Sequence, residues 1–400
     1  MKSMPLEGLK VLEMGTLIAG PFCGRLLAEF GAEVIKIETP GEGDPLRKWR
    51  KLHDDGNEKT SLWWYAQARN KKSVTVNLRE KEGQEIVRKL ALGADIIVEN
   101  FRPGTLEKWD LGPEVLKAAN PGLVIARISG YGQDGPNAHK AGYASVCEGY
   151  GGLRYVNGVP GQPPVRPNLS IGDTLAGLHA AFGILLALHA RGRTGAGQVV
   201  DVALFESVFN LLEGVIPEFD GAGVVREPSG STVTGIVPTN TYRCADGRWA
   251  IIGGNGDSIY KRLMRAAGRA DLADDPRLAH NPGRVQHEAE IDAAIAAWTA
   301  TLPLAEILSS LETAGVPAGP IYSVRDMFAD PQYQARGLFE RVEIDGRPLA
   351  IPAIPPKLSA TPGGTGWAGP AIGSHTEAVL GELLGMDAET IGGLRERGVV

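Results

Sequence analysis

A single carboxylate, Asp173, stands where a loop gives way to a long apolar stretch that we expect to be a helix at 174–190. Two interpretations are open for it. Aspartate is a common helix cap, because its side chain accepts hydrogen bonds from the free backbone N–H groups at a helix start. The same carboxylate can act as a nucleophile, with those N–H groups stabilising an oxyanion. Composition alone favours the cap, so the rest of the chain has to decide.

The chain lacks the motifs on which several other enzyme chemistries depend. It has no P-loop, no G-x-S-x-G elbow, no H-E-x-x-H pair and no G-x-G-x-x-G after the first expected strand. Its seven histidines do not have the spacing of metal ligands, and Cys23, Cys147 and Cys244 are far apart. A metal site, a disulfide framework and a nicotinamide or flavin cofactor are therefore not indicated.

Two other features could serve a reaction. The glycine-rich turn Gly253-Gly254-Asn255-Gly256 follows an expected strand at 249–252. Such a turn lets backbone N–H groups approach a reactive centre, although it could equally be an ordinary strand-to-helix connection. Basic runs at 47–51 and 69–72 could meet an anionic ligand or simply lie in solvent.

The composition is that of a globular protein. The chain has 400 residues, 43% of them hydrophobic and 22% charged, which suits a large core divided between two domains. The formal charge of −6 argues against nucleic acid as a main partner. No stretch has the apolar length that we expect of a membrane span, and no signal peptide is evident. We therefore expect a cytoplasmic enzyme with no membrane partner.

The first half of the chain alternates between strand and helix patterns, which predicts an α/β fold with a Rossmann-like parallel sheet covered on both faces. The expected strands lie at 9–14, 33–38, 73–78, 95–99 and 123–129, and the expected helices at 21–30, 84–92, 114–119 and 174–190. Ligands of such sheets bind at the carboxyl ends of the strands, where glycine-containing loops begin at 20, 100 and 129.

The second half predicts a smaller domain. We expect a large Rossmann-like domain at 1–212, a linker at 213–240, a small α+β domain at 241–330 and a C-terminal return to the large domain at 331–400. The small domain should open with a hairpin around 245–248 and continue with helices at 259–267, 288–299 and 304–314. A second turn is expected at 343–347, and a last helix near 377–384.

Short strings along nearly the whole chain resemble one family, the class III CoA-transferases of the CaiB/BaiF type. This family shares its fold with the alpha-methylacyl-CoA racemases. No single string is decisive, but their order is specific. They are LEGLKVL at 6–12, AGP at 19–21, GAEVIKIE at 31–38, GD at 43–44, NKKS at 70–73, ENFRPG at 99–104, ISGYGQ at 128–133, GY at 142–143, GD at 172–173, GQVVD at 197–201 and GVP at 315–317.

The resemblance implies that Asp173 is the catalytic nucleophile. The carboxylate would attack an acyl-CoA thioester to give a mixed anhydride, and the released thiolate would convert this into an aspartyl-CoA thioester. Exchange of one thioester for another needs no cofactor beyond coenzyme A itself. The turn formed by Gly253, Gly254, Asn255 and Gly256 would cover the anhydride and exclude water. The resemblance also implies a homodimer in which two ring-shaped chains interlock.

The resemblance further implies a CoA site on the large domain. Arg79 and Lys108 are candidates for the phosphates, because the nucleotide end of CoA is polyanionic. Thr39 replaces a basic residue that some members use, so Arg47, Arg50 or Lys72 could share that role. The CoA-binding residues implied are Ile18, Ala19, Lys72, Asn77, Leu78, Arg79, Asn100, Phe101, Arg102, Lys108, Ala141, Gly142 and Tyr143, with Trp49 as an active-site residue.

Two alternatives within and beyond the family stay open. A racemase would place a catalytic histidine directly after Gly142, but the chain has Tyr143 there, and His139 is out of register. Phenols, whose ordinary pKa is about 10, are poor bases near neutral pH. A transferase is therefore favoured over a racemase. A non-catalytic CoA-binding protein would be favoured only if Asp173 were missing or blocked.

The acids that exchange CoA are harder to predict. Formyl-CoA transferases carry a glutamine where this chain has Ile18, although Trp49 matches an active-site tryptophan of that group. The closing strings IGGL at 391–394 and GVV at 398–400 resemble enzymes that move CoA from succinyl-CoA to a dicarboxylate. Ala144 stands where many members have an acidic residue, and Asp257 ends the glycine turn. Either difference could alter recognition of the acceptor.

Overall fold

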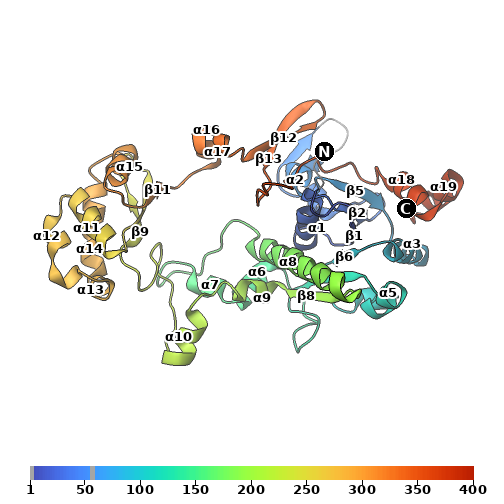
Figure 1. The fold of residues 1–400 in the computed structure, drawn as a ribbon, viewed down its shortest axis with the longest axis horizontal. Helices are drawn as coiled ribbons and strands as arrows, with labels where there is room; N and C mark the ends of the chain where they lie inside the picture. Colours follow the sequence, from blue (N-terminus) through green and yellow to red (C-terminus); the bar gives the residue numbers. More distant parts are fainter. Residues whose placement is uncertain (1–3, 55–58) are drawn as a thin grey trace. The chain divides into compact units, whose positions relative to one another are not determined.

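The computed structural model describes residues 4–54 and 59–400 (Figure 1). The chain forms two compact units, and each is described by itself. The first contains the residues up to Leu153 together with Pro167–Glu213 and Arg336–Val400. The second contains Arg154–Arg166 and Gly214–Ala335. The domain limits predicted from the sequence differ in detail and stay a prediction.

The first unit is built on a parallel sheet of six strands in the order β5-β2-β1-β6-β7-β8. If these six strands are numbered 1 to 6 along the chain, their order in the sheet is 3-2-1-4-5-6, as in a doubly wound Rossmann sheet. The strand order reverses between β1 and β6, although all strands run parallel. The predicted α/β class and parallel sheet are therefore confirmed. The strands are β1 Lys10–Glu13, β2 Glu33–Glu38, β5 Lys71–Thr75, β6 Ile96–Glu99, β7 Val124–Ser129 and β8 Val199–Ala203.

Two apolar layers cover the sheet, because buried strand residues alternate between its faces. One layer joins Leu12 and Ile97 to α3, α5 and the C-terminal helices, and the other joins Val11 and Ile96 to α1, α6 and α8. In Figure 1, α18 lies near β5 and α3, which it contacts. The helices are α1 Ala19–Glu29, α3 Lys81–Leu92, α5 Pro113–Ala119, α6 Ala144–Tyr150, α8 Ile171–Thr194, α18 Thr376–Leu384 and α19 Ala388–Glu396.

Smaller elements complete the first unit. They are the short helices η1 Pro45–Lys48, α2 Leu62–Gln67, α4 Thr105–Lys108 and α9 Leu204–Phe209, and the hairpins β3 Leu52–Asp54 with β4 Lys59–Ser61 and β12 Phe339–Ile344 with β13 Arg347–Pro352. The predicted turn at 343–347 is confirmed by the second hairpin. Helix α7, Leu153–Val156, lies where the two units meet along the chain.

Helix α8 corrects the expectation that no stretch is apolar enough to cross a membrane. It has 24 residues, and an 18-residue window within it reaches a mean hydropathy of 1.6. In the structure the helix packs on α1, α9, β7 and β8. Core helices of globular proteins have the same length and composition, so these two properties do not by themselves indicate a span. The helix also begins at Ile171, three residues before the predicted start.

The second unit contains a three-stranded antiparallel sheet in the order β11-β10-β9, packed against helices around one apolar core. The predicted hairpin is confirmed as β9 and β10, and the helix predicted at 288–299 is α14. Helix α10 lies within the stretch that was predicted as a linker. The elements are α10 Val215–Ala222, β9 Thr239–Arg243, β10 Trp249–Gly253, α11 Asp257–Ala266, α12 Ala270–Asp274, η2 Pro276–Leu278, α13 Asn281–Gln286, α14 Glu288–Thr299, α15 Leu304–Thr313, β11 Ala318–Pro320, α16 Val324–Ala329 and α17 Pro331–Ala335.

One glycine in α1 allows a buried charge to lie against the helix. A Cβ atom at Gly24 would lie only 1.8 Å from Oε2 of Glu13. Glu13 is fully buried and is ion-paired with Lys36 at 3.0 Å and with Lys71 at 2.7 Å. Glycine inside a helix costs roughly 0.5–1 kcal/mol relative to alanine. Here that cost is offset by the room that the carboxylate needs.

We predict that Gly24→Ala lowers the free energy of unfolding by about 2 kcal/mol, because the new methyl group must displace Glu13 or shift α1. Chemical denaturation followed by circular dichroism measures the change. Gly392→Ala is the matched control, since Gly392 is also helical and a Cβ there meets nothing within 4 Å. The control should leave stability unchanged or raise it by up to about 1 kcal/mol. Equal effects of both substitutions would contradict the prediction.

Candidate active site

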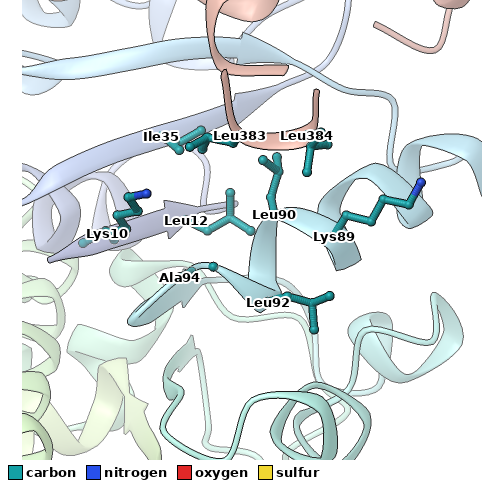
Figure 2. Close-up of a pocket in the computed structure, with 11 residues that line it drawn as sticks. Lys10, Leu12, Ile35, Lys89, Leu90, Leu92, Ala94, Leu383 and Leu384 are labelled. Carbon is teal, nitrogen blue, oxygen red and sulfur yellow. The ribbon is translucent and has the colours of Figure 1, made fainter. Parts of the chain in front are cut away.

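The first unit contains a cavity that can be set aside. Its volume is about 370 Å³, and it lies where β1 and β6 begin, below the C-terminal helix α18. Figure 2 shows leucine side chains facing one another across it. Its lining has no carboxylate, hydroxyl, thiol or imidazole group, and its only polar side chains are those of Lys10 and Lys89. It offers no nucleophile to an acyl group.

A second cavity, of about 220 Å³, lies at the carboxyl ends of the strands and contains Asp173. Its walls are the loops after β1, β6 and β7, the start of α6 and the first turn of α8. Because β1 and β6 flank the point where the strand order reverses, this is the place where doubly wound sheets bind ligands. The lining is Thr16, Leu17, Ile18, Ala19, Trp49, Asn100, Phe101, Arg102, Pro103, Ile128, Ser129, Gly130, Lys140, Ala141, Gly142, Tyr143, Asp173 and Leu204.

Asp173 is not the cap of its helix. Helix α8 begins at Ile171 after Ser170, which makes no side-chain capping bond, so Asp173 is the third helical residue. The start of the helix is supported from α6, where the buried Glu148 accepts a hydrogen bond from the Gly172 N–H at 3.3 Å. Asp173 therefore lies in the first turn, where the helix dipole stabilises a negative charge.

Close packing holds helix α8 against the start of α1. One turn after Asp173, a Cβ atom at Gly177 would lie 2.7 Å from the carbonyl oxygen of Ala19. The two helices can approach this closely only because residue 177 has no side chain. The first turns of both helices consequently border the same cavity.

The loop after β6 is joined to the loop after β1 by Asn100. The Thr16 N–H donates to Oδ1 of Asn100 at 2.8 Å, and Nδ2 of Asn100 donates to the Thr16 carbonyl oxygen at 2.9 Å. Next to it, the buried Glu99 accepts from the Phe101 N–H at 2.7 Å and from Nε of Arg127 at 2.8 Å. Burial raises the pKa of Glu99 to about 7, although Arg127 opposes this rise.

The loop after β7 meets the start of α6 through two glycines. A Cβ atom at Gly130 would lie 2.8 Å from the Cα atom of Gly142, so the backbones touch. This contact brings Tyr143 to the cavity, where its side chain is 71% exposed. The neighbouring Cys147 is a poor rival nucleophile. Burial, together with the charges of Asp173 and Glu148, raises the pKa of its thiol to about 11.

The cavity brings together ten of the residues proposed for the site from the sequence: Ile18, Ala19, Trp49, Asn100, Phe101, Arg102, Ala141, Gly142, Tyr143 and Asp173. Others lie outside its lining. Lys72 is ion-paired with Glu33, and the Asn77 N–H donates to the Val399 carbonyl oxygen at 2.8 Å. Leu78, Arg79 and Lys108 are also absent from the lining. Their roles toward CoA stay a prediction.

The glycine turn belongs to the second unit, and part of its backbone is already engaged there. The Gly253 N–H donates to the Pro317 carbonyl oxygen, and the Gly254 N–H donates to the Pro238 carbonyl oxygen, both at 2.9 Å. The buried Arg284 donates to the Asn255 carbonyl oxygen at 2.6 Å. These bonds fix the shape of the turn. The N–H groups of Gly253 and Gly254, which were expected to face a reactive centre, are therefore already hydrogen-bonded within the second unit.

Asp257, at the end of the glycine turn, is held by two side chains of its own unit. It is paired with Nη1 of Arg284 at 2.9 Å and with Nδ1 of His280 at 2.8 Å. Hydrogen bonds from His280 and Arg284 hold its pKa below the usual range. The carboxylate therefore serves to anchor the turn.

Sequence reasoning missed several residues of the cavity. Leu17 and Lys140 stand next to a proposed residue and Thr16 stands two positions before one, so extending the motifs by one or two positions would have found them. Glu148 had no such signal, because its role depends on the packing of α6 against α8. In residues 4–54 and 59–400, no group of three or more His, Cys, Asp and Glu side chains could hold a metal ion.

Comparison with known proteins agrees with this geometry. The model of CoA-transferase family III matches residues 6–376. The chain belongs to CoA-transferase family III. It is 47% identical over 397 residues to the succinyl-CoA–D-citramalate CoA-transferase of Chloroflexus aurantiacus (strain ATCC 29366 / DSM 635 / J-10-fl), covering 99% of this chain and 98% of the relative.

Two further relatives extend this similarity. The alpha subunit of the succinyl-CoA–L-malate CoA-transferase of Chloroflexus aurantiacus is 39% identical over 404 residues, covering 100% of this chain and 93% of the relative. The crystal structure of a CaiB/BaiF family protein from Brucella suis matches with a TM-score of 0.85 and 36% identity, covering 96% of this chain and 100% of that one. The chain is thus a CoA-transferase, as the motifs predicted.

Proposed function

We propose that this CoA-transferase moves CoA from succinyl-CoA to a dicarboxylic acid through covalent intermediates on Asp173. The observation that carries the proposal is the place of Asp173, in the first turn of α8 and in the wall of the cavity at the strand reversal. The names of the relatives support the acids, since they pair succinyl-CoA with citramalate or with malate. Both of those acceptors are hydroxylated dicarboxylates.

The reaction proceeds in two symmetrical halves. An oxygen of Asp173 attacks the thioester carbonyl of succinyl-CoA, the C–S bond breaks, and CoA thiolate leaves a succinyl-aspartyl anhydride. The thiolate then attacks the aspartyl carbonyl carbon and releases succinate, giving an aspartyl-CoA thioester. The acceptor carboxylate attacks this thioester and expels the thiolate. Attack of the thiolate on the acceptor's acyl carbon completes the new thioester and restores Asp173.

The CoA molecule would reach Asp173 along the loops after β1 and β6. Ile18, Ala19 and Asn100 would contact the acyl-bearing arm beside the carboxylate. Arg102 and Lys140 are exposed cations on the rim of the cavity, and they suit the phosphate groups of CoA. Arg79 and Lys108 are retained as proposed phosphate contacts further along the first unit.

We predict that wild-type protein given succinyl-CoA and a panel of acids transfers CoA to dicarboxylates, with citramalate and malate among the best acceptors. Asp173→Asn should lower transfer by at least about a thousandfold, because an amide cannot form the anhydride. Wild-type protein given succinyl-CoA alone should carry CoA on the peptide that contains Asp173. Mass spectrometry of the CoA products and of borohydride-trapped peptides measures both results.

The control is Asp387→Asn. Asp387 is a true cap, since its side chain accepts from the Thr390 N–H at 2.8 Å at the start of α19. Asparagine caps about as well as aspartate, so this variant should keep both its stability and its transfer rate. Substantial turnover by Asp173→Asn, with no adduct on the Asp173 peptide of the wild type, would show that the mechanism is wrong.

A second prediction separates the transferase from the racemase of the same fold. Wild-type protein incubated with a 2-methylacyl-CoA in deuterated water should exchange no alpha proton above background, because Tyr143 offers a phenol where a racemase needs a base. Mass spectrometry of the recovered thioester measures the exchange, and transfer activity in the same sample shows that the protein is active. Fast exchange that Tyr143→Phe abolishes would favour the racemase.

A homodimer in the cytoplasm is proposed for the functional assembly. Helix α8 exposes Leu178, Phe182, Leu185 and Leu186 along one face, with exposed fractions between 44% and 59%. Their spacing of three and four residues forms a continuous apolar stripe. Exposed apolar stripes of this kind mark protein interfaces, and a second copy of the chain is the partner that the family resemblance implies.

We predict that the wild-type protein sediments as a dimer at low concentration, with no folded monomer. Phe182→Glu should weaken assembly, because it places a charge in the middle of the apolar stripe. Leu92→Glu is the control, since Leu92 is similarly exposed at 52% but lies on α3, away from the stripe. Analytical ultracentrifugation measures all three proteins. A folded wild-type monomer, or identical behaviour of the two variants, would count against the proposed interface.

A further inference from the structure

The turn between β1 and α1 has a backbone shape that its sequence does not favour. Thr16, Leu17, Ile18 and Ala19 all line the cavity that contains Asp173. Leu17 has a φ angle of 64°, in the left-handed region that residues other than glycine rarely adopt. Something outside the turn must therefore hold this shape, since a leucine left to itself would leave it.

Side chains from other segments bind the turn and the start of α1 at four points, and all of them except the half-buried Asn100 are buried. Lys36 donates to the Gly15 carbonyl oxygen at 2.7 Å, and Asn100 binds both polar backbone groups of Thr16. The Leu17 N–H donates to both carboxylate oxygens of Asp44, at 3.1 Å to Oδ1 and at 3.2 Å to Oδ2. Lys71 donates to the Pro21 carbonyl oxygen at 2.7 Å.

Asp44 is itself fixed by its surroundings. Its N–H donates to Oε2 of Glu38 at 2.8 Å, and its side chain accepts from the Leu46 N–H at 2.8 Å at the start of η1. Oδ2 is paired with Nζ of Lys36 at 2.9 Å. The carboxylate that meets Leu17 therefore cannot turn away without breaking bonds to two other elements.

The surrounding cluster is electrically balanced. It consists of three carboxylates and three cations, nearly all of them fully buried: Glu13, Glu38, Asp44, Lys36, Arg47 and Lys71. Burial disfavours each charge, but Asp44 and Glu13 hold the pKa of Lys36 above its ordinary value, and Lys36 holds the pKa of Asp44 below its own. A buried charge that loses its partner is strongly destabilised, so these ion pairs fix the positions of the side chains in the cluster.

We propose that Asp44, held by Lys36, is a positioning residue that keeps Leu17 in its left-handed conformation and thereby shapes the wall of the cavity that contains Asp173. The inference rests on the proposed function only where it concerns the reaction. The Gly-Asp pair at 43–44 was among the strings that resemble the family, and the structure gives its aspartate this specific contact. Asp44 touches no reacting group, so it acts only through the turn.

The first experiment measures the turn without substrate. In the variant Asp44→Asn the amide group cannot pair with Lys36, so its bond to the Leu17 N–H weakens. Amide hydrogen exchange of the peptide spanning 15–22 should become at least tenfold faster, whereas peptides of the second unit should be unchanged. Equal exchange in wild type and variant overturns the proposal. If Asp44→Asn does not fold, Asp44→Glu keeps the charge beside Lys36 but moves the oxygens, and it should give the same result.

The second experiment tests the left-handed residue by rescue. Glycine adopts this region freely, whereas alanine shares the preference of leucine against it by on the order of tenfold. In the Asp44→Asn background, Leu17→Gly should form the aspartyl-CoA adduct about tenfold faster than Leu17→Ala. In the wild-type background the two variants should differ by no more than about twofold, because Asp44 enforces the conformation on both.

The alanine variant removes the leucine side chain in the same way as the glycine variant, so the ratio of the two reports on the backbone alone. The same ratio in both backgrounds overturns the proposal. If wild-type protein forms no adduct at all, the proposed function fails, and the hydrogen exchange of the 15–22 peptide still decides the present inference.

Discussion

The approach of Gly177 to the carbonyl oxygen of Ala19 is the contact on which the site depends. It brings α8 against the start of α1, and α1 begins directly after the strand at which the sheet reverses its order. Asp173 lies one helical turn before that contact. A larger residue at 177 would push the two helix starts apart, and the carboxylate would leave the place where the loops after β1 and β6 converge. The position of Asp173 therefore depends on residue 177 being a glycine.

A cluster of buried charged side chains holds the turn between β1 and α1 in place. Removing six charged groups from water costs several kcal/mol each, so a cluster such as that around Glu13 and Lys36 is a poor source of stability. Its value lies in the geometry that it enforces, because three of its members hydrogen-bond the backbone of the turn at Gly15 and Leu17 and of the first turn of α1 at Pro21. An apolar core could fill the same volume but could not hold those polar backbone groups.

The sequence predicted the parts of the structure that depend on local patterns. Strand and helix periodicity predicted the sheet, and the resemblance to the family implied Asp173, Asn100 and Tyr143 as site residues, all of which line one cavity. Prediction from the sequence failed where contacts between distant segments determine the local structure. The start of α8 at Ile171 depends on Glu148 from another helix, and the left-handed Leu17 depends on Asp44 and Lys36. The prediction also missed that helix α8 reaches the apolar length of a membrane span, because the predicted range 174–190 began too late and ended too early compared with Ile171–Thr194.

The size of the cavity explains how a transferase can work with so little machinery. A volume of about 220 Å³ holds an acyl group and a thioester but is far smaller than CoA. In the proposed reaction the nucleotide end of CoA would extend over the surface of the first unit, where Arg102 and Lys140 are exposed. Exchanging one thioester for another is nearly balanced in energy. For the proposed mechanism the protein has to supply a carboxylate held in place, donors at the helix starts, and exclusion of water from the anhydride. The first two are provided within the first unit by α1 and α8. Water exclusion needs a cover for a cavity whose rim includes the exposed Tyr143.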